Sequence, residues 1–207
     1  MKFTMLLKKR KMGMPSKTLI DIVKDVIIED LHLITNEDDL SIVIEEQHEQ
    51  AQCRFVKINL KKSISYFGFS IDKHTQGGKT DPVYPFFNAQ YEGICSKNDA
   101  ILFLQKSNKV YVLLIEMKST NLGNYLNQLK AGKSFVDFVL QRIHIFDKIN
   151  TEVEFRGLLF SCRQIPNEGT TKKQKVTFED RNGLLVSENP GNDTYHIQQF
   201  LEKINEV

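Results

Sequence analysis

Apolar residues recur at helical spacing in two long stretches of the chain. The first runs from Ser16 to about Leu33, with Ser16 as the expected N-cap, and its apolar positions are Leu19, Ile20, Val23, Val26, Ile27 and Leu31. The second runs from Leu122 to about Phe146, and its apolar positions are Leu126, Leu129, Phe135, Phe138, Val139, Ile143 and Phe146. The pattern therefore predicts two amphipathic helices.

Other segments alternate polar and apolar positions, or are rich in β-branched and aromatic residues, which predicts strands. These segments are Ser41 to Glu45, Cys53 to Leu60, Ser63 to Ile71, Asp99 to Gln105, Val110 to Lys118 and Phe155 to Ser161. Glycines and prolines mark Lys73 to Pro85 as a loop. Near the C-terminus we expect a hairpin of Val176–Glu179 with Leu184–Ser187, and a last helix from Asn192 or Asp193 to about Ile204.

Two of the predicted strands are apolar on both faces. One side carries Ile101, Phe103, Val112 and Leu114, and the other carries Leu102, Leu104, Leu113 and Ile115. Such strands need a layer of structure above and below them. The pattern predicts an α/β protein, a three-layer α/β/α sandwich around a buried central sheet.

Composition narrows the class of protein. A length of 207 residues suits one domain with at most a small appendage, so we expect a basic leader over 1–15, a core over 16–161 and a C-terminal extension, packed on the core, over 162–207. The net charge of +2 does not by itself indicate a nucleic-acid-binding protein, so local patches would have to bind one.

Cysteine usage and hydropathy bear on the cellular compartment. Cys53, Cys95 and Cys162 are widely separated, which argues against a structural zinc site and a disulfide framework. No run of 18 apolar residues is present, so no membrane span is expected. These features favour a cytoplasmic protein.

One pair of carboxylates has a predictable geometry. If Ser107 and Asn108 form a two-residue turn, the strand register places Asp99 directly opposite Glu116, roughly 5 Å apart at Cβ. A three-residue turn would instead place Asp99 on the other face. Lys118 lies two residues after Glu116 and shares its face.

Two adjacent carboxylates suit a hard divalent cation such as Mg²⁺. A nearby lysine can orient or activate water, or neutralise developing charge. Together these groups outline a site for phosphodiester cleavage. The alternative is a surface ion pair between Glu116 and Lys118, with Asp99 as a turn or cap residue.

The stretch KNDAILFLQKSNKVYVLLIEMKS, Lys97 to Ser119, resembles the motif of the PD-(D/E)xK nuclease superfamily. Asp99 matches the metal-binding aspartate, and Glu116-Met117-Lys118 matches the ExK tripeptide. The resemblance spans about 16–161 and implies a restriction-endonuclease-like αβββαβ core with a central mixed sheet. It implies Mg²⁺, for which Mn²⁺ can substitute, held by Asp99, Glu116 and the Met117 carbonyl, and a product with a 5′-phosphate.

The resemblance also suggests secondary residues. Many members carry a further acid on the first core helix. No single acid stands out here, but Glu29, near the end of the first predicted helix, and Glu92, just before the Asp99 segment, are favoured as the additional acid. The other candidates are Asp21, Asp25, Asp30, Glu45 and Glu46. A solvated surface acid is the alternative for each. The resemblance places a polar residue one turn into the helix after the ExK strand, which matches Gln128. Some repair nucleases have a Gln-x-x-x-Tyr motif there, but Gly132 occupies the tyrosine position.

Several polar residues are candidate nucleic-acid contacts. They are Lys97, Gln128, Lys130 and Lys133. The alternative for each lysine is solubilising charge, and for Gln128 a solvent-facing side chain.

These features together predict a Mg²⁺-dependent nuclease that acts on DNA more readily than on RNA, in defence against foreign DNA or in repair. Cleavage of both strands would need two active sites, which favours a homodimer or a larger complex. One rival is a nuclease-fold binding module or partner-dependent subunit, which would bind nucleic acid without cutting it. A second rival is a structural or interaction protein, which would bind neither metal nor nucleic acid.

Overall fold

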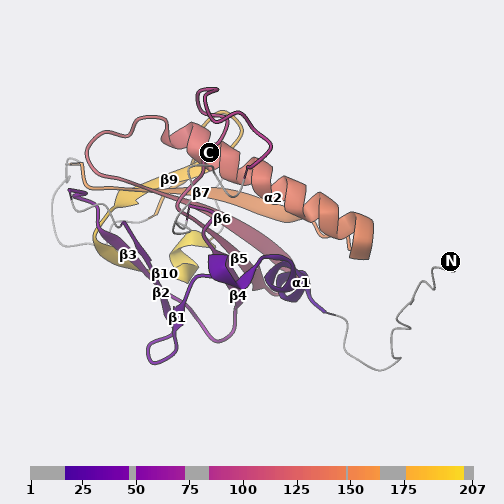
Figure 1. The fold of residues 1–207 in the computed structure, drawn as a ribbon. Coiled ribbons are helices and arrows are strands. Elements are labelled where there is room, and N and C mark those ends of the chain that lie inside the picture. Colours follow the sequence, from indigo (N-terminus) through magenta and orange to yellow (C-terminus); the bar gives the residue numbers. More distant parts are fainter. Residues whose placement is uncertain (1–16, 47–49, 73–83, 148, 164–175, 203–207) are drawn as a thin grey trace, which may run out of the picture.

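A computed structural model describes residues 17–46, 50–72, 84–147, 149–163 and 176–202. Within them the chain is a mixed α/β protein with two sheets (Figure 1). The larger sheet has the strand order β4-β5-β6-β7-β9-β8, and the smaller sheet has the order β1-β2-β3-β10. The predicted basic leader lies outside the described residues.

The first helix is shorter than the sequence pattern predicts. Helix α1 spans Leu19–Val26, and a short 3-10 helix, η1, follows at Glu29–Leu31. Thr18 caps α1 through a reciprocal pair of hydrogen bonds with Asp21, so the N-cap within the described residues is Thr18. The predicted range of 16 to 33 was therefore too long. Its β-branched run Val26-Ile27-Ile28 is poorly suited to a helix, and the backbone becomes extended at Ile27.

The larger sheet contains the predicted hairpin. Its bounds are β4 (Ser65–Phe69), β5 (Ala100–Lys106), β6 (Lys109–Lys118), β7 (Val153–Ser161), β8 (Glu179–Asp180) and β9 (Leu185–Pro190). Strands β5 and β6 are antiparallel with Lys106 opposite Lys109 and Ala100 opposite Ile115, which confirms the predicted two-residue turn and register. The turn is made at Ser107, whose φ of 56° lies in the left-handed region.

The two faces of this sheet pack against different partners. Helix α2 (Tyr125–Asp147) connects β6 to the parallel strand β7, and together with α1 it covers the face that carries Ile101 and Val112. The opposite face, which carries Leu102 and Leu113, packs against the smaller sheet and the 3-10 helix η2 (Ile197–Phe200). The predicted α/β/α layering was thus wrong in one respect, because among the described residues the second outer layer is built mainly from strands.

The smaller sheet combines residues from both ends of the described chain. Its strands are β1 (Thr35–Asn36), β2 (Ser41–Glu45), β3 (Phe55–Asn59) and β10 (Asp193–His196). Strand β10 pairs in parallel with β3, where Tyr195 is opposite Ile58.

The predicted last helix was wrong over Asp193 to His196. Tyr195 is buried against Phe160 and Phe200, and this packing together with the free edge of β3 favours a strand there. The predicted C-terminal hairpin is present as β8 and β9, with shifted bounds.

Candidate active site

The three residues of the predicted catalytic group come together at one end of the β5–β6 hairpin. Asp99 lies directly before β5, and its Oδ2 accepts a hydrogen bond of 2.5 Å from the backbone amide of Met117. Glu116 is fully buried near the end of β6, and Lys118 Nζ lies 2.6 Å from its Oε1. The alternation of side chains places Asp99, Glu116 and Lys118 on the face covered by the two helices.

The burial of Glu116 is unusual for a carboxylate. Neither of its oxygens accepts a hydrogen bond of good geometry from any described residue, so the contact with Lys118 is an ion pair and not an aligned hydrogen bond. A buried charge with so few partners is costly. Glu116 therefore needs either a proton or a further cation.

Electrostatics lead to the same conclusion. Burial and, as a smaller cause, the neighbouring Asp99 carboxylate together raise the pKa of Glu116 to about 8 against the opposing effect of Lys118. Burial also raises the pKa of Asp99 to about 6, although the hydrogen bond from the Met117 amide and the charge of Lys118 oppose this. Glu116 therefore holds a proton near neutral pH, and Asp99 holds one below about pH 6, unless a cation compensates their charge.

The residues present fit a hard divalent cation. Mg²⁺ characteristically takes one or two protein carboxylates and completes its coordination with water and substrate oxygens. Asp99 and Glu116 could supply those two carboxylates. Among the described residues no group of three His, Cys, Asp or Glu side chains is arranged to hold a metal by itself.

A groove with a volume of about 610 Å³ opens beside Asp99. Its wall includes two acids that the sequence analysis did not favour, Asp72 and Glu46, and both raise the pKa of Asp99. Asp72 also raises the pKa of Glu116. The signal that could have identified Asp72 is its place just past the end of the strand paired with β5, since β4 ends at Phe69 opposite Ile101.

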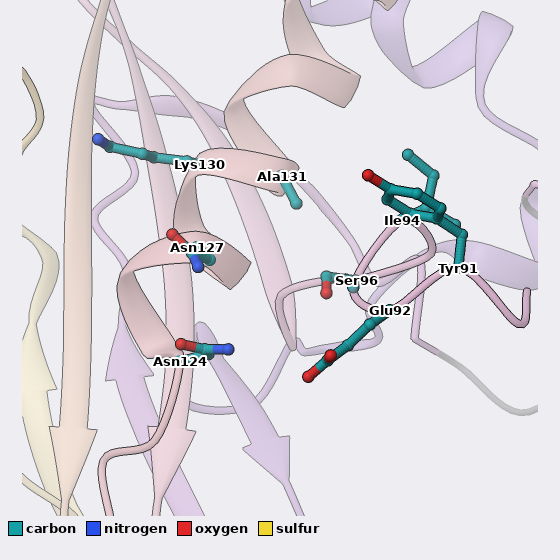
Figure 2. Close-up of a pocket in the computed structure, with 9 residues that line it drawn as sticks. Tyr91, Glu92, Ile94, Ser96, Asn124, Asn127, Lys130 and Ala131 are labelled. Atoms are coloured by element: carbon teal, nitrogen blue, oxygen red, sulfur yellow. The ribbon is translucent and has the colours of Figure 1, made fainter.

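The predicted additional acids are less closely associated with this site. Glu29 lies exposed on η1 and is not one of the residues that line the groove beside Asp99. Glu92 lines a separate pocket of about 790 Å³ between the segment 91–96 and the start of α2 (Figure 2). Lys130 lies across this pocket on α2, so the structure places Glu92 and Lys130 in the same pocket.

Gln128 and Lys97 hold the segment that leads into Asp99. Gln128 Nε2 donates a hydrogen bond of 3.3 Å to the backbone carbonyl of Lys97. The Lys97 side chain is only 16% exposed, and its Nζ lies 3.7 Å from Asp72 Oδ1. Both residues have contacts within the protein, and their role in binding nucleic acid stays a prediction.

Lys133 lies further from the carboxylates than Lys97 does. Its Nζ lies 2.7 Å from Asp137 and 4.5 Å from the centre of the Phe155 ring. Phe155 pairs with Val112, four residues before Glu116 along β6. Lys133 therefore packs toward the opposite end of the sheet.

Asn98 is a positioning residue that the sequence analysis missed. It is fully buried, and its Nδ2 donates to the backbone carbonyls of Ala100 at 2.6 Å and Ile115 at 3.2 Å. Ala100 follows Asp99, and Ile115 precedes Glu116. The Asn98 carboxamide therefore joins the two strands at the residues next to both acids.

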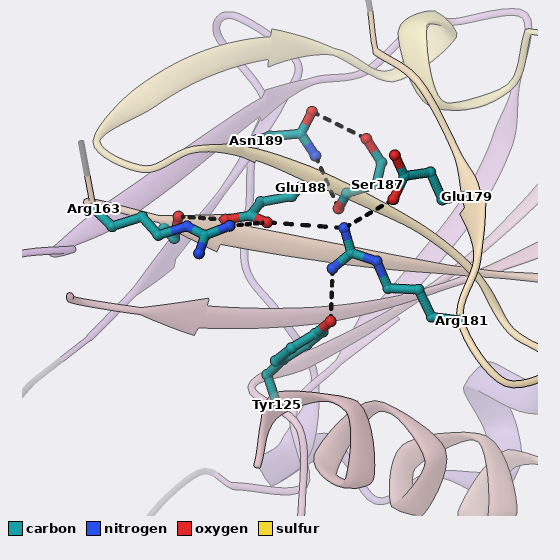
Figure 3. A network of polar contacts seen from close by, with 8 residues as sticks. Tyr125, Arg163, Glu179, Arg181, Ser187, Glu188 and Asn189 are labelled. Atoms are coloured by element: carbon teal, nitrogen blue, oxygen red, sulfur yellow. Dashed lines mark hydrogen bonds and ion pairs between the residues drawn. The ribbon is translucent and has the colours of Figure 1, made fainter. Parts of the chain in front are cut away.

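A polar network lies near the ends of β7 and β9, at the same end of the sheet as the carboxylates (Figure 3). Arg181 donates to the Tyr125 hydroxyl at 2.6 Å and lies 3.9 Å from Glu188, while Arg163 lies 2.6 Å from the same Glu188 carboxylate. Glu188 also accepts from Ser161, which pairs with Lys118 across the β6–β7 ladder. The network fastens the first residue of α2 to the strands beside the site.

Comparisons with protein-family models, with curated proteins and with solved structures find no match to this chain. None of the helices in the described parts of the chain has the length and apolar character needed to cross a membrane. The cytoplasmic location expected from the sequence stays a prediction.

Proposed function

We propose that this chain is a metal-dependent nuclease of the PD-(D/E)xK type, and that it hydrolyses phosphodiester bonds in nucleic acid, with DNA preferred over RNA. The observation that carries this proposal is the buried Glu116 carboxylate, paired with Lys118 at 2.6 Å and placed across the hairpin from Asp99. An ordinary surface ion pair would not bury its carboxylate completely or raise its pKa to about 8.

The order of elements supports the proposal. The sequence α1, β4, β5, β6, α2, β7 follows the αβββαβ order of a restriction-endonuclease-like core, and β7 lies parallel to β6. Strands β1 to β3 stand between α1 and β4 and form most of the smaller sheet. This insertion is a departure from the minimal core.

Each member of the catalytic group has a defined task in this proposal. Asp99 and Glu116 would hold Mg²⁺ or Mn²⁺, together with the Met117 carbonyl. The metal when bound lowers the pKa of water and compensates the charge that develops on phosphate oxygens. Lys118 would orient and activate the attacking water through its ammonium group, which Glu116 holds in place. The family resemblance implies a 5′-phosphate product and a role in foreign-DNA defence or repair.

A cleavage assay tests the proposal directly. Wild-type protein is incubated with plasmid, single-stranded DNA and RNA in Mg²⁺ or Mn²⁺, alongside Asp99→Asn, Lys118→Ala and the control Lys133→Ala. We expect cleavage by wild type and the control, and a loss of at least about 100-fold in the two site variants. Equal cleavage by folded Lys118→Ala and wild type would contradict the assignment.

A second candidate is a nuclease-fold subunit that binds nucleic acid but cuts only with a partner, or never. The observation that favours it is the limited ligand set, because no three-ligand cluster is present among the described residues. Binding of DNA without cleavage under every metal condition would support this reading. A homodimer, expected for double-strand cleavage, is tested by light scattering of the purified chain.

A further inference from the structure

Two cysteines that are far apart in the sequence lie side by side in the fold. A β-carbon built on Gly191 would lie 2.1 Å from Cys53 Sγ and 2.8 Å from Cys162 Sγ. Both sulfur atoms therefore lie beside the same residue. The two thiols also influence each other electrostatically, because Cys162 adds to the larger effect of burial in raising the pKa of Cys53. Both cysteines are free thiols in the structure.

The two cysteines lie next to strands of different sheets, and hydrogen bonds of the backbone hold each of them in place. Cys162 follows β7, and its amide donates to the carbonyls of Lys118 at 3.1 Å and Ser119 at 3.0 Å. Cys53 precedes β3, and the Ser119 hydroxyl accepts from its amide at 3.4 Å. The carboxamide of Asn192 donates to Cys162 Sγ at 3.3 Å. These contacts present the two sulfurs to each other immediately beside the end of β6.

We propose that Cys53 and Cys162 form a reversible redox site, in which a peroxide converts the thiol pair into a disulfide that ties the segment before β3 to the end of β7. The bond requires the sulfurs to approach to about 2.05 Å. Only a local adjustment is needed, because both sulfur atoms already lie beside Gly191. Such bridges in a reducing compartment are characteristically transient and redox-sensing.

The chemistry balances in two steps. The sulfur of Cys162 attacks one peroxide oxygen, the O–O bond breaks, and the leaving oxygen takes the thiol proton to give water and a sulfenic acid. The sulfur of Cys53 then attacks the sulfenyl sulfur, the S–O bond breaks, and the departing hydroxide takes the Cys53 proton. Two thiols and one hydrogen peroxide yield one disulfide and two waters.

The surroundings of the two thiols determine the order of these steps. Cys53 is 1% exposed, and burial raises its pKa to about 12, so it stays protonated until the second step. Cys162 is partly exposed and is therefore the sulfur that a peroxide reaches first. Cys95 is also partly exposed, and it serves as an internal reference for unselective oxidation.

The full chain is reduced, treated with hydrogen peroxide, and then alkylated in denaturant and digested for mass spectrometry. We expect a cross-linked Cys53–Cys162 peptide, with Cys95 still free to be alkylated, and full reversal by dithiothreitol. The oxidised protein should melt roughly 5–10 °C higher than the reduced protein. Cys95→Ser should behave as wild type, whereas Cys162→Ser should lose both the cross-link and the melting shift.

Three outcomes would overturn the proposal. They are oxidation of Cys162 to sulfinic acid without a linked peptide, a link that involves Cys95, and a melting shift that persists in Cys162→Ser. A Cys53→Ala variant repeats the test from the other partner in case Cys162→Ser does not fold. Because every readout is covalent or thermal, the result is independent of nuclease activity.

Discussion

Asn98 and Gly132 fit so closely that a β-carbon on Gly132 would lie 2.1 Å from Asn98 Oδ1. The glycine on α2 makes room for the carboxamide that joins β5 to β6 next to both acids. This contact accounts for the glycine at the position that corresponds to the tyrosine of the Gln-x-x-x-Tyr motif. In this chain the Asn98 side chain, which lies just before β5, occupies the space next to Gly132.

The first prediction follows from that contact. Gly132→Ala should destabilise the protein by about 1–3 kcal/mol through overpacking, even though alanine favours a helix by about 1 kcal/mol relative to glycine. Urea unfolding provides the measurement. The control Ser134→Ala, at an exposed position of α2, should leave the free energy of unfolding within about 0.5 kcal/mol of wild type. Equal or greater stability of Gly132→Ala would show that Asn98 does not limit the space.

The second prediction concerns the pH dependence of stability. Because the pKa of Glu116 is about 8 in the folded protein and 4.5 as its ordinary value, the folded state binds more protons than the unfolded state between these pH values. Wild-type stability should therefore fall as pH rises from about 4.5 to about 8, by up to roughly 1.4 kcal/mol per pH unit. Glu116→Gln removes this titration and should be more stable than wild type at pH 9.

Thermal melts across that range, recorded with EDTA, measure the effect. The matched control is Glu92→Gln, which replaces an exposed acid and should reproduce the wild-type pH profile. A Glu116→Gln profile that is parallel to wild type would show that Glu116 titrates at an ordinary pKa.

The third prediction is that a divalent cation stabilises the protein and releases protons. Metal binding must displace the proton that Glu116 retains near neutral pH, together with the proton of Asp99 at a pH below about 6. Mn²⁺ or Mg²⁺ at 100 times its dissociation constant should add about 2.7 kcal/mol to the free energy of unfolding. Calorimetry at pH 7 in two buffers of different ionisation enthalpy measures the proton release.

The variants Asp99→Asn and Glu116→Gln should lose both effects, while Glu92→Gln should keep them. Metal stabilisation that survives in Glu116→Gln would place the cation elsewhere on the protein.

The fourth prediction separates two lysines of α2. Lys130 lines the open pocket shown in Figure 2, whereas Lys133 is held by Asp137 and the Phe155 ring. Lys130→Ala should weaken DNA binding and reduce the salt dependence of the binding constant by about one phosphate contact. Lys133→Ala should leave DNA binding unchanged. Fluorescence anisotropy in Ca²⁺ over a series of salt concentrations makes the comparison, and the reverse order would contradict it.

The sequence predicts the centre of the fold well because the two faces of the hairpin are unambiguous. Every apolar position from Ile101 to Leu104 and from Val112 to Ile115 lies on the predicted side of β5 or β6. Side chains alternate between the two faces of a strand, so with a short turn only one pairing register places the apolar residues of β5 and β6 on matching faces. The positions of Asp99 and Glu116 follow from this register.

Other features depend on contacts that a single sequence does not display. Tyr195 forms a strand because β3 offers an unpaired edge and Phe160 a packing surface, and both lie far from it in the sequence. Asp72 joins the site through the pairing of β4 with β5. Cys53 and Cys162 meet only after both sheets have formed.

The C-terminal segment supplies strands to both sheets, since β8 and β9 extend the larger sheet beyond β7, and β10 pairs with β3 in the smaller sheet. During synthesis on a ribosome, the nascent chain would therefore contain Asp99, Glu116 and Lys118 well before its sheets could close. Until residues up to His196 emerge, β7 and β3 each keep an open edge, which invites mispairing with other chains. A translation product that stops after Ser161 would carry the whole catalytic group on an incomplete scaffold.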